Sequence, residues 1–190
     1  MNPKDVWLML ARYASLLMLS IGNLSVFYLV FTPLTLYASY FIINLMYPEI
    51  VIASSDMALF QINENFIQLV EACIAGAAYY FLLILNLSTP MGAKTRVKSI
   101  VFIFASFFIL NILRIVVFTA MFLNGYSYFD LAHIAVWYFG STLMLLIVWF
   151  VNVKLLNILS IPVYTDIRTI LDDIKSKSHA GNRTRIKIPR

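Results

Sequence analysis

The stretch SIVFIFASFFILNILRIVVFTAMFL, residues 99–123, carries one charged side chain, Arg114, among apolar neighbours. As a helix it rises about 37 Å, which exceeds the roughly 30 Å hydrocarbon thickness of a bilayer. The whole chain has the same character, since 62% of its 190 residues are hydrophobic and 12% are charged. Soluble domains average about 45–50% apolar and about 25% charged residues. The sequence therefore predicts an integral membrane protein with one domain.

Three further stretches, residues 13–31, 69–87 and 131–153, are long and apolar enough to cross a bilayer as helices. Between the first two, Pro33 and Pro48 bracket a tyrosine-rich segment that rises about 21 Å as a helix, too little to cross. Tyrosine suits the membrane surface, so we expect a short interfacial helix there. Residues 49–72 mix β-branched residues with turn residues and predict an outer hairpin-like segment. The predicted fold class is an all-α integral membrane protein with four transmembrane helices plus these two outer elements.

The basic residues determine the expected orientation of these spans. Lys4, Arg12, the loop AKTRVK at residues 93–98 and the C-terminal tail all face the cytoplasm if both termini are cytoplasmic. Counting residues 33–48 as a fifth span would place Lys4 and Arg12 outside, so that alternative is rejected. Residues 1–158 then form a single transmembrane domain, and residues 159–190 a basic cytoplasmic tail. The net charge of +5 is explained by this asymmetry, and no nucleic-acid partner is expected.

Under this topology, three polar side chains from three spans approach the outer face of the membrane. Cys73, the single cysteine, begins the second span, and His133 begins the fourth. Arg114 lies roughly 14 Å below the outer end of the third span, and its long side chain can reach upward. Taken singly, a cysteine in a membrane helix is often a packing residue. A histidine near a helix start often lies in the polar interface.

Arg114 is the hardest of the three to explain as a packing residue. A charge in hydrocarbon costs at least about 2.5–3.5 kcal/mol on insertion scales, so the guanidinium must face a partner or a wet cavity. The sequence leaves open a structural partner, such as a helix carbonyl or Glu71. Asn111 precedes Arg114 by one helical turn and is the nearest polar neighbour on the same helix face.

Together, a thiol, an imidazole and a guanidinium are the groups that cysteine acyl transfer uses. The Cys73 thiolate would be the nucleophile, because neighbouring positive charge stabilises a thiolate. The His133 imidazole can carry a proton to the leaving amine, and the Arg114 guanidinium can stabilise the oxyanion of a tetrahedral intermediate. A metal site is disfavoured because the chain offers too few soft ligands. No nucleotide motif is present, so no cofactor is expected.

These motifs, in this order, resemble the exosortase/archaeosortase family of membrane transpeptidases. The block VEACIAG, residues 70–76, is similar to the family's Glu-Ala-Cys-Ser/Thr-Gly block, which puts the nucleophile on Cys73. NILRI, residues 111–115, is similar to the Asn-x-x-Arg-Ile element and puts the family arginine on Arg114. GYSYFDLAHIAVW, residues 125–137, resembles the next helix start, whose arginine or histidine is here His133. The resemblance covers roughly residues 33–155.

One departure from the family pattern lies beside the nucleophile. The sequence CIAG replaces Cys-Ser-Gly, so the glycine is displaced by one position and the small hydroxyl neighbour of the cysteine is lost. With the short chain, this pattern resembles a compact archaeal branch, the pacearchaeosortases. The departure bears on the substrate motif more than on the chemistry.

The resemblance implies a membrane cysteine protease or transpeptidase, with the catalytic domain in residues 1–158 and no cofactor. Its partners would be substrate proteins that end in a short motif, a transmembrane helix and a basic cluster, and a membrane-lipid acceptor. The site would lie at the outer face of the cell membrane. The alternative is a non-enzymatic membrane scaffold or accessory subunit in which Arg114 is structural. A transporter is disfavoured because no repeat or broken helix pair is visible.

Overall fold

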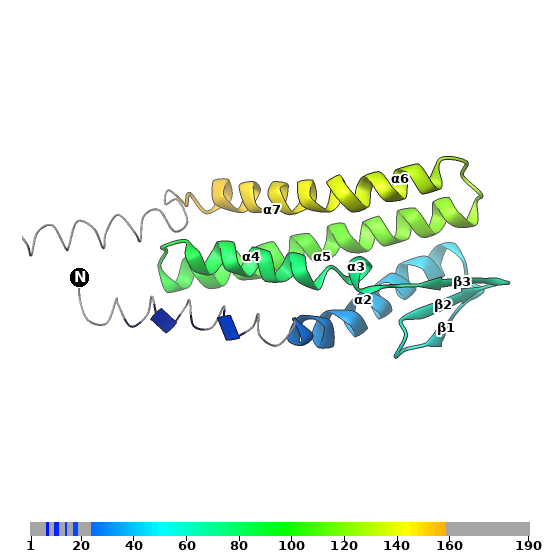
Figure 1. Cartoon of the computed structure of the whole chain (residues 1–190), viewed down its shortest axis with the longest axis horizontal. Coiled ribbons are helices and arrows are strands. Elements are labelled where there is room, and N and C mark those ends of the chain that lie inside the picture. The colour runs from blue at the N-terminus through cyan, green and yellow to red at the C-terminus, as the bar shows by residue number, and fades with distance from the viewer. Residues whose placement is uncertain (1–6, 8–9, 12–13, 15–16, 19–23, 159–190) are drawn as a thin grey trace, which may run out of the picture.

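The computed structural model describes residues 24–158 and, before them, residues 7, 10, 11, 14, 17 and 18. Its helices lie side by side along one axis, and a small sheet covers one end of the bundle (Figure 1). In chain order the elements are α2 (Ser25–Met46), β1 (Ile50–Ser54), β2 (Leu59–Ile62), β3 (Asn65–Gln68), α3 (Glu71–Ile74), α4 (Gly76–Ser88), α5 (Ala93–Leu123), α6 (Phe129–Ala135), the π-helix η1 (Val136–Gly140) and α7 (Ser141–Leu155).

Four helical stretches within the described residues are long and apolar enough to cross a membrane. They are α2, α3 with α4 (Glu71–Ser88), α5, and α6 through α7 (Phe129–Leu155). Each presents apolar side chains on its outer surface, for example Leu29 of α2 and Phe150 of α7, which are 78% and 65% exposed. Exposed apolar helices of this length are typical of chains whose solvent is lipid. The described residues therefore form a mostly helical structure with four helices that could span a membrane, and to that extent they agree with the predicted class.

Charged residues separate towards the two ends of the bundle. Successive spans run in opposite directions, so the sheet and the α5–α6 loop share one end, and the α4–α5 loop and the end of α7 share the other (Figure 1). Within the described residues, the basic side chains Lys94, Arg96, Lys98 and Lys154 belong to the second end. The acidic side chains are Glu49, Asp56, Glu64, Glu71 and Asp130, which belong to the sheet end. Arg114 is the exception, because it lies inside α5.

The prediction of a short interfacial helix after Pro33 is wrong. Pro33 lies inside α2, which continues as one helix from Ser25 to Met46. Proline removes one backbone donor, but α2 buries one face on both sides of it, from Phe27 to Ile43, and this packing keeps the helix continuous. The chain breaks instead at Leu24, whose φ of 59° is left-handed. The predicted bounds of the first span, residues 13–31, are also wrong where the structure describes them, because the candidate spanning helix runs from Ser25 to Met46. The predicted tail, residues 159–190, lies outside the described residues.

The predicted hairpin-like segment is present and is extended by a third strand. The strands form an antiparallel sheet in the order β1-β2-β3, with Ile50 opposite Ile62 and Ile62 opposite Asn65. Asn63, in the two-residue turn between β2 and β3, has a φ of 54°, a left-handed conformation that asparagine tolerates. The all-α description is therefore incomplete at the sheet end.

Helix α5 contributes to two apolar cores among the described residues. One core joins α2, α4, α5 and α7, and in it the Phe31 and Tyr79 rings stack with centroids 3.7 Å apart. The other core joins the sheet to α2 and α5 through residues such as Phe60 and Ile112. The nucleophile candidate, Cys73, packs against this second core. α3 and the middle of α5 are in contact where the two cores meet.

A buried polar cluster joins three helices at the basic end of the bundle. Asn86 of α4 and Asn152 of α7 both donate hydrogen bonds to the Ser99 hydroxyl of α5, at 2.6 and 2.9 Å. Arg96 adds a hydrogen bond of 2.7 Å to the Asn86 carbonyl. Side-chain hydrogen bonds between apolar helices stabilise their association. This cluster fixes α4, α5 and α7 relative to one another at the end away from Cys73.

Candidate functional site

Cys73 lies in α3, a single helical turn between the sheet and α4. Its N–H donates to the Val70 carbonyl at 2.8 Å, so the turn starts from Val70, two residues after the end of β3. The turn ends at Ala75, whose φ of 60° and ψ of 37° are left-handed, and α4 begins at Gly76. A left-handed residue redirects the chain, and non-glycine residues adopt this conformation at a cost of about 1–2 kcal/mol. Cys73 is therefore held on its own turn, separate from the helix α4.

Gly76 allows α2 to approach this turn closely. A Cβ atom at Gly76 would lie 2.8 Å from Cζ of Tyr28, and real Cβ atoms do not come that close. Gly76 itself is buried. The glycine that follows the left-handed residue therefore serves packing, whereas the left-handed conformation falls on an alanine.

Arg114 connects the Cys73 turn to α7. One guanidinium nitrogen, Nη2, donates to the carbonyls of Ala72 and Cys73, at 3.2 and 3.4 Å. The other, Nη1, donates to the hydroxyl of Ser141, the first residue of α7. Of the partners that the sequence left open, the helix carbonyl is the one observed. Glu71 is exposed and forms no ion pair with Arg114.

Asn111 contacts the same carbonyl one helical turn before Arg114. Its Nδ2 donates to the Cys73 carbonyl at 2.8 Å, and its side chain is fully buried. Its Oδ1 has no hydrogen-bond partner within the described residues. The expectation that Asn111 is a close polar neighbour of the site agrees with this contact. Two residues of α5 thus hold the backbone of the nucleophile candidate.

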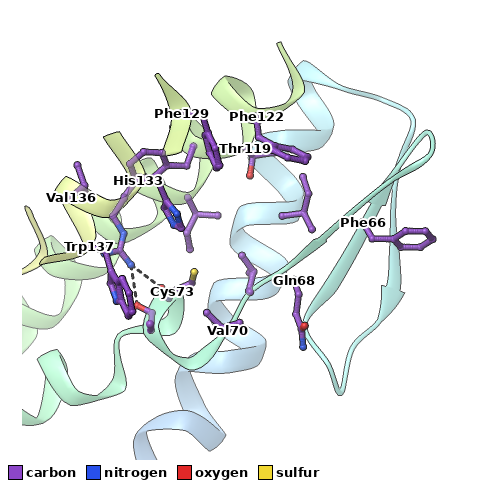
Figure 2. A pocket seen from close by; sticks show the side chains of 16 residues that line it. Phe66, Gln68, Val70, Cys73, Thr119, Phe122, Phe129, His133, Val136 and Trp137 are labelled. Carbon is purple, nitrogen blue, oxygen red and sulfur yellow. Dashed lines mark hydrogen bonds between the residues drawn. The ribbon is translucent and has the colours of Figure 1, made fainter. Parts of the chain in front are cut away.

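His133 lies in the last turn of α6, across from the Cys73 turn. Its ring stacks on Phe129, with centroids 5.4 Å apart and an interplanar angle of 12°. Phe118 of α5 meets the same ring edge-on at 5.2 Å. Figure 2 shows the His133 ring and the Cys73 sulfur directed into the space between α3 and α6. The imidazole is therefore oriented by aromatic packing.

Cys73, Arg114 and His133 line one cavity of about 410 Å³ (Figure 2). Apolar side chains make most of the remaining wall. The other lining residues are Phe66, Ile67, Gln68, Leu69, Val70, Ala72, Ile115, Phe118, Thr119, Phe122, Phe129, Val136 and Trp137. The three residues singled out in the sequence come from α3, α5 and α6, so the fold brings together side chains that are distant in the chain.

Trp137 and Ser141 also contact the site, and neither was predicted from the sequence. Trp137 lines the cavity and Ser141 accepts the Arg114 hydrogen bond. Trp137 lies within η1 and Ser141 directly follows it, and the π-helical turn changes the register of the helix face. Gly140 permits this turn, since a Cβ there would lie 2.8 Å from a Val136 methyl group. Periodicity alone assumes an unbroken α-helix, so Gly140 is the residue that could have indicated the π-helical turn from the sequence.

Comparison with protein families, curated proteins and solved structures gives no match for this chain. Among the described residues, no three His, Cys, Asp or Glu side chains gather as a metal-binding group. The interpretation of the site therefore depends on its own geometry and chemistry.

Proposed function

We propose that this protein is a membrane-embedded cysteine transpeptidase. It would cleave a C-terminal sorting signal from secreted proteins and transfer the new C-terminus to a membrane lipid. One observation carries the proposal. A thiol, an imidazole and a guanidinium from three separate elements meet at one apolar cavity near the sheet end of a helical bundle. These are the groups that acyl transfer through a thioester requires.

The proposed reaction has two acyl-transfer steps. The Cys73 thiol gives its proton to His133, and the thiolate attacks the scissile carbonyl carbon. A carbon–sulfur bond forms, the carbon–nitrogen bond breaks, and the leaving amine takes the proton from His133. A lipid hydroxyl then attacks the thioester and transfers its proton to His133, and the carbon–sulfur bond breaks. Water in place of the lipid hydroxyl would make the same sequence a hydrolysis.

Arg114 has a positioning role in this proposal. Its two terminal nitrogens donate to the carbonyls of the Cys73 turn and to Ser141, so the oxyanion contact expected from the sequence would require those bonds to open. In the described geometry it fixes the turn that carries the thiol and adds positive charge beside the thiolate. Asn111 shares the first task through the Cys73 carbonyl.

The local backbone supports the resemblance on which the substrate class depends. The family block has glycine two residues after the cysteine, and here that position is Ala75. Its left-handed φ of 60° is a conformation that favours glycine. A glycine at this position would adopt that conformation without strain, so the local backbone is compatible with the glycine of the family block.

The proposed orientation places both termini in the cytoplasm and the cavity at the outer face. The separation of charge between the two ends of the bundle supports it, because basic residues stay on the cytoplasmic side. In this orientation the sheet lies outside, where a secreted substrate would arrive. A cysteine introduced at Ser55, on a Cys73→Ser background, should react with an impermeant thiol reagent in intact cells, whereas one at Lys94 should not.

The decisive experiment replaces the nucleophile. The reporter is a secreted protein of the same cell that ends in an extended segment, an apolar helix and a basic cluster. Cys73→Ala should abolish its processing and the thioester-linked intermediate, while Ser106→Ala, on the same bundle but outside the cavity, serves as the matched control. The amount of each variant in the membrane is measured alongside. Full processing of the reporter by the Cys73→Ala variant at normal abundance would refute the proposed transpeptidase function.

A membrane scaffold is the second candidate, and the bonding of Arg114 favours it. A guanidinium that bridges α3 and α7 has a structural function whether or not Cys73 reacts. A scaffold should tolerate Cys73→Ala and lose its assembly when Arg114 is replaced. The same pair of variants therefore separates the two functions.

A further inference from the structure

The third strand of the sheet has an unpaired edge. β3 pairs with β2 on one side, and within the described residues no strand pairs with its other side. The Leu69 N–H donates to the carbonyl of Ala58, the residue directly before β2, at 2.9 Å. Because bonded residues alternate in an antiparallel ladder, the N–H and C=O groups of Phe66 and Gln68 must point away from β2. These backbone groups are available for an additional strand.

The cavity runs along this free edge and ends at the thiol. Residues 66–70 all line it, followed by Ala72 and Cys73. The side chains of Phe66 and Gln68 point away from the cavity (Figure 2), and the Gln68 amide reaches the Met57 carbonyl at 3.5 Å. Phe66 and Gln68 therefore line the cavity with their backbone atoms, at the free edge of β3. The cavity thus joins a row of backbone donors and acceptors to the nucleophile candidate.

The opposite wall is apolar and comes from α5, α6 and η1. Ile115, Phe122, Phe129 and Trp137 are among the apolar residues of this wall. An extended peptide next to β3 would form backbone hydrogen bonds with the strand edge. Its side chains would alternate in direction, so that every second one faces this wall. Strand addition of this kind is a common way to bind extended peptides.

We propose that the free edge of β3 binds the substrate segment as an added strand, parallel to β3, with apolar side chains at alternate positions. This inference rests on the proposed function of the site. The direction follows from the order of the substrate and the position of the bundle. β3 runs towards Cys73 and the spans beyond it, and the helix of a C-terminal signal follows its cleaved segment. The substrate must therefore run in the same direction as β3.

Peptide probes test the strand pairing on the whole protein in detergent micelles. The probe is a pentapeptide of alternating alanine and valine with a C-terminal vinyl sulfone, and the measurement is its rate of attachment to Cys73 by mass spectrometry. N-methylation of every second amide should slow labelling about tenfold for each hydrogen bond removed, while methylation of the intervening amides should leave the rate unchanged. Iodoacetamide, which needs no strand, calibrates the reactivity of the thiol.

Variants of the strand edge provide a matched comparison. Gln68→Pro removes the outward N–H, and Gln68→Ala removes the same side chain but keeps that N–H. Probe labelling should be about tenfold slower in the proline variant than in the alanine variant. Iodoacetamide should label both variants equally. If the proline variant fails to fold, the methylated probes still decide the question on the unaltered protein.

Several outcomes would overturn the proposal. Labelling that is insensitive to N-methylation, as expected if the cavity holds a lipid chain, would exclude strand pairing. Faster labelling by a pentapeptide with its electrophile at the N-terminus would exclude the parallel direction. The reporter experiment with Cys73→Ala tests a separate claim. The edge of β3 can bind a strand even if no reporter is processed, and a reporter can be processed even if no strand binds to this edge.

Discussion

Replacing Ser141 by alanine tests the link between the two sides of the site. The Ser141 hydroxyl accepts from Arg114 and donates to the Val136 carbonyl at 3.3 Å. Alanine removes only the hydroxyl, so the volume of the helix interface scarcely changes. The variant leaves one guanidinium nitrogen without its partner next to the cavity. The bond between α5 and α7 is then lost while the Ala72 and Cys73 carbonyls keep their donors.

The expected loss of stability can be worked from these contacts. A hydrogen bond to a charged group contributes about 1.5–3 kcal/mol, and the bond to the Val136 carbonyl is longer and adds less. For a chain of this size, 1 kcal/mol shifts the melting temperature by about 2–4 °C. The Ser141→Ala variant should therefore melt about 3–12 °C lower. Processing of the reporter should also fall, because the helix that carries His133 is no longer fixed to the Cys73 turn.

Thermal unfolding of the purified protein in micelles measures the effect, with Ser106→Ala as the control. Ser106 lies on the same helix as Arg114 and outside the cavity, so its loss should change the free energy of unfolding by no more than about 0.5 kcal/mol. A double-mutant cycle with Arg114→Met isolates the pair and should give a coupling of about 1.5–3 kcal/mol. A coupling below about 0.5 kcal/mol would show that Arg114 and Ser141 do not interact, and that Arg114 does not link α5 to α7.

Three further substitutions have expected outcomes. Ala75→Gly should stabilise the protein, by up to about 1 kcal/mol in thermal unfolding, because glycine adopts the left-handed conformation without strain; a lower melting temperature would contradict this. Gly76→Ala, one position later, should destabilise by about 1–3 kcal/mol, since its Cβ would overlap the Tyr28 ring; an unchanged melting temperature would argue against that contact. His133→Ala should slow reporter processing about 10²–10⁴-fold at normal abundance; recovery in His133→Arg would assign a charge role instead of proton transfer.

The membrane class and the division of charge could be predicted from the sequence because both are properties of composition and loop position. The membrane forces helices, and the ends of the spans then follow from charged and turn residues. The same reasoning brought Cys73, Arg114 and His133 towards one end of the bundle, where the structure gives them a common cavity. Their catalytic roles stay predictions, tested by the variants above.

Other features depended on contacts that a linear pattern does not contain. Pro33 was expected to separate the first span from a short interfacial helix, but packing of one face of α2 against the bundle outweighs the local preference of proline. The contact between Arg114 and Ser141 depends on η1, whose additional residue rotates the following face of the helix. The third strand was missed because residues 65–68 were not separated from the turn that precedes them.

The residue spacing along helix α5 fixes the distance between the buried polar cluster and the candidate site. It carries Ser99 of the buried polar cluster, Asn111 and Arg114 beneath the thiol, and Phe122 in the cavity wall. The stretch from Ser99 to Arg114 rises about 22 Å, and adding or removing one residue within it would rotate everything beyond by about 100°. Loops can change length without such an effect. Among proteins that share this site, the spacing along α5 should therefore be inherited unchanged, even where the sheet and the tail differ in length.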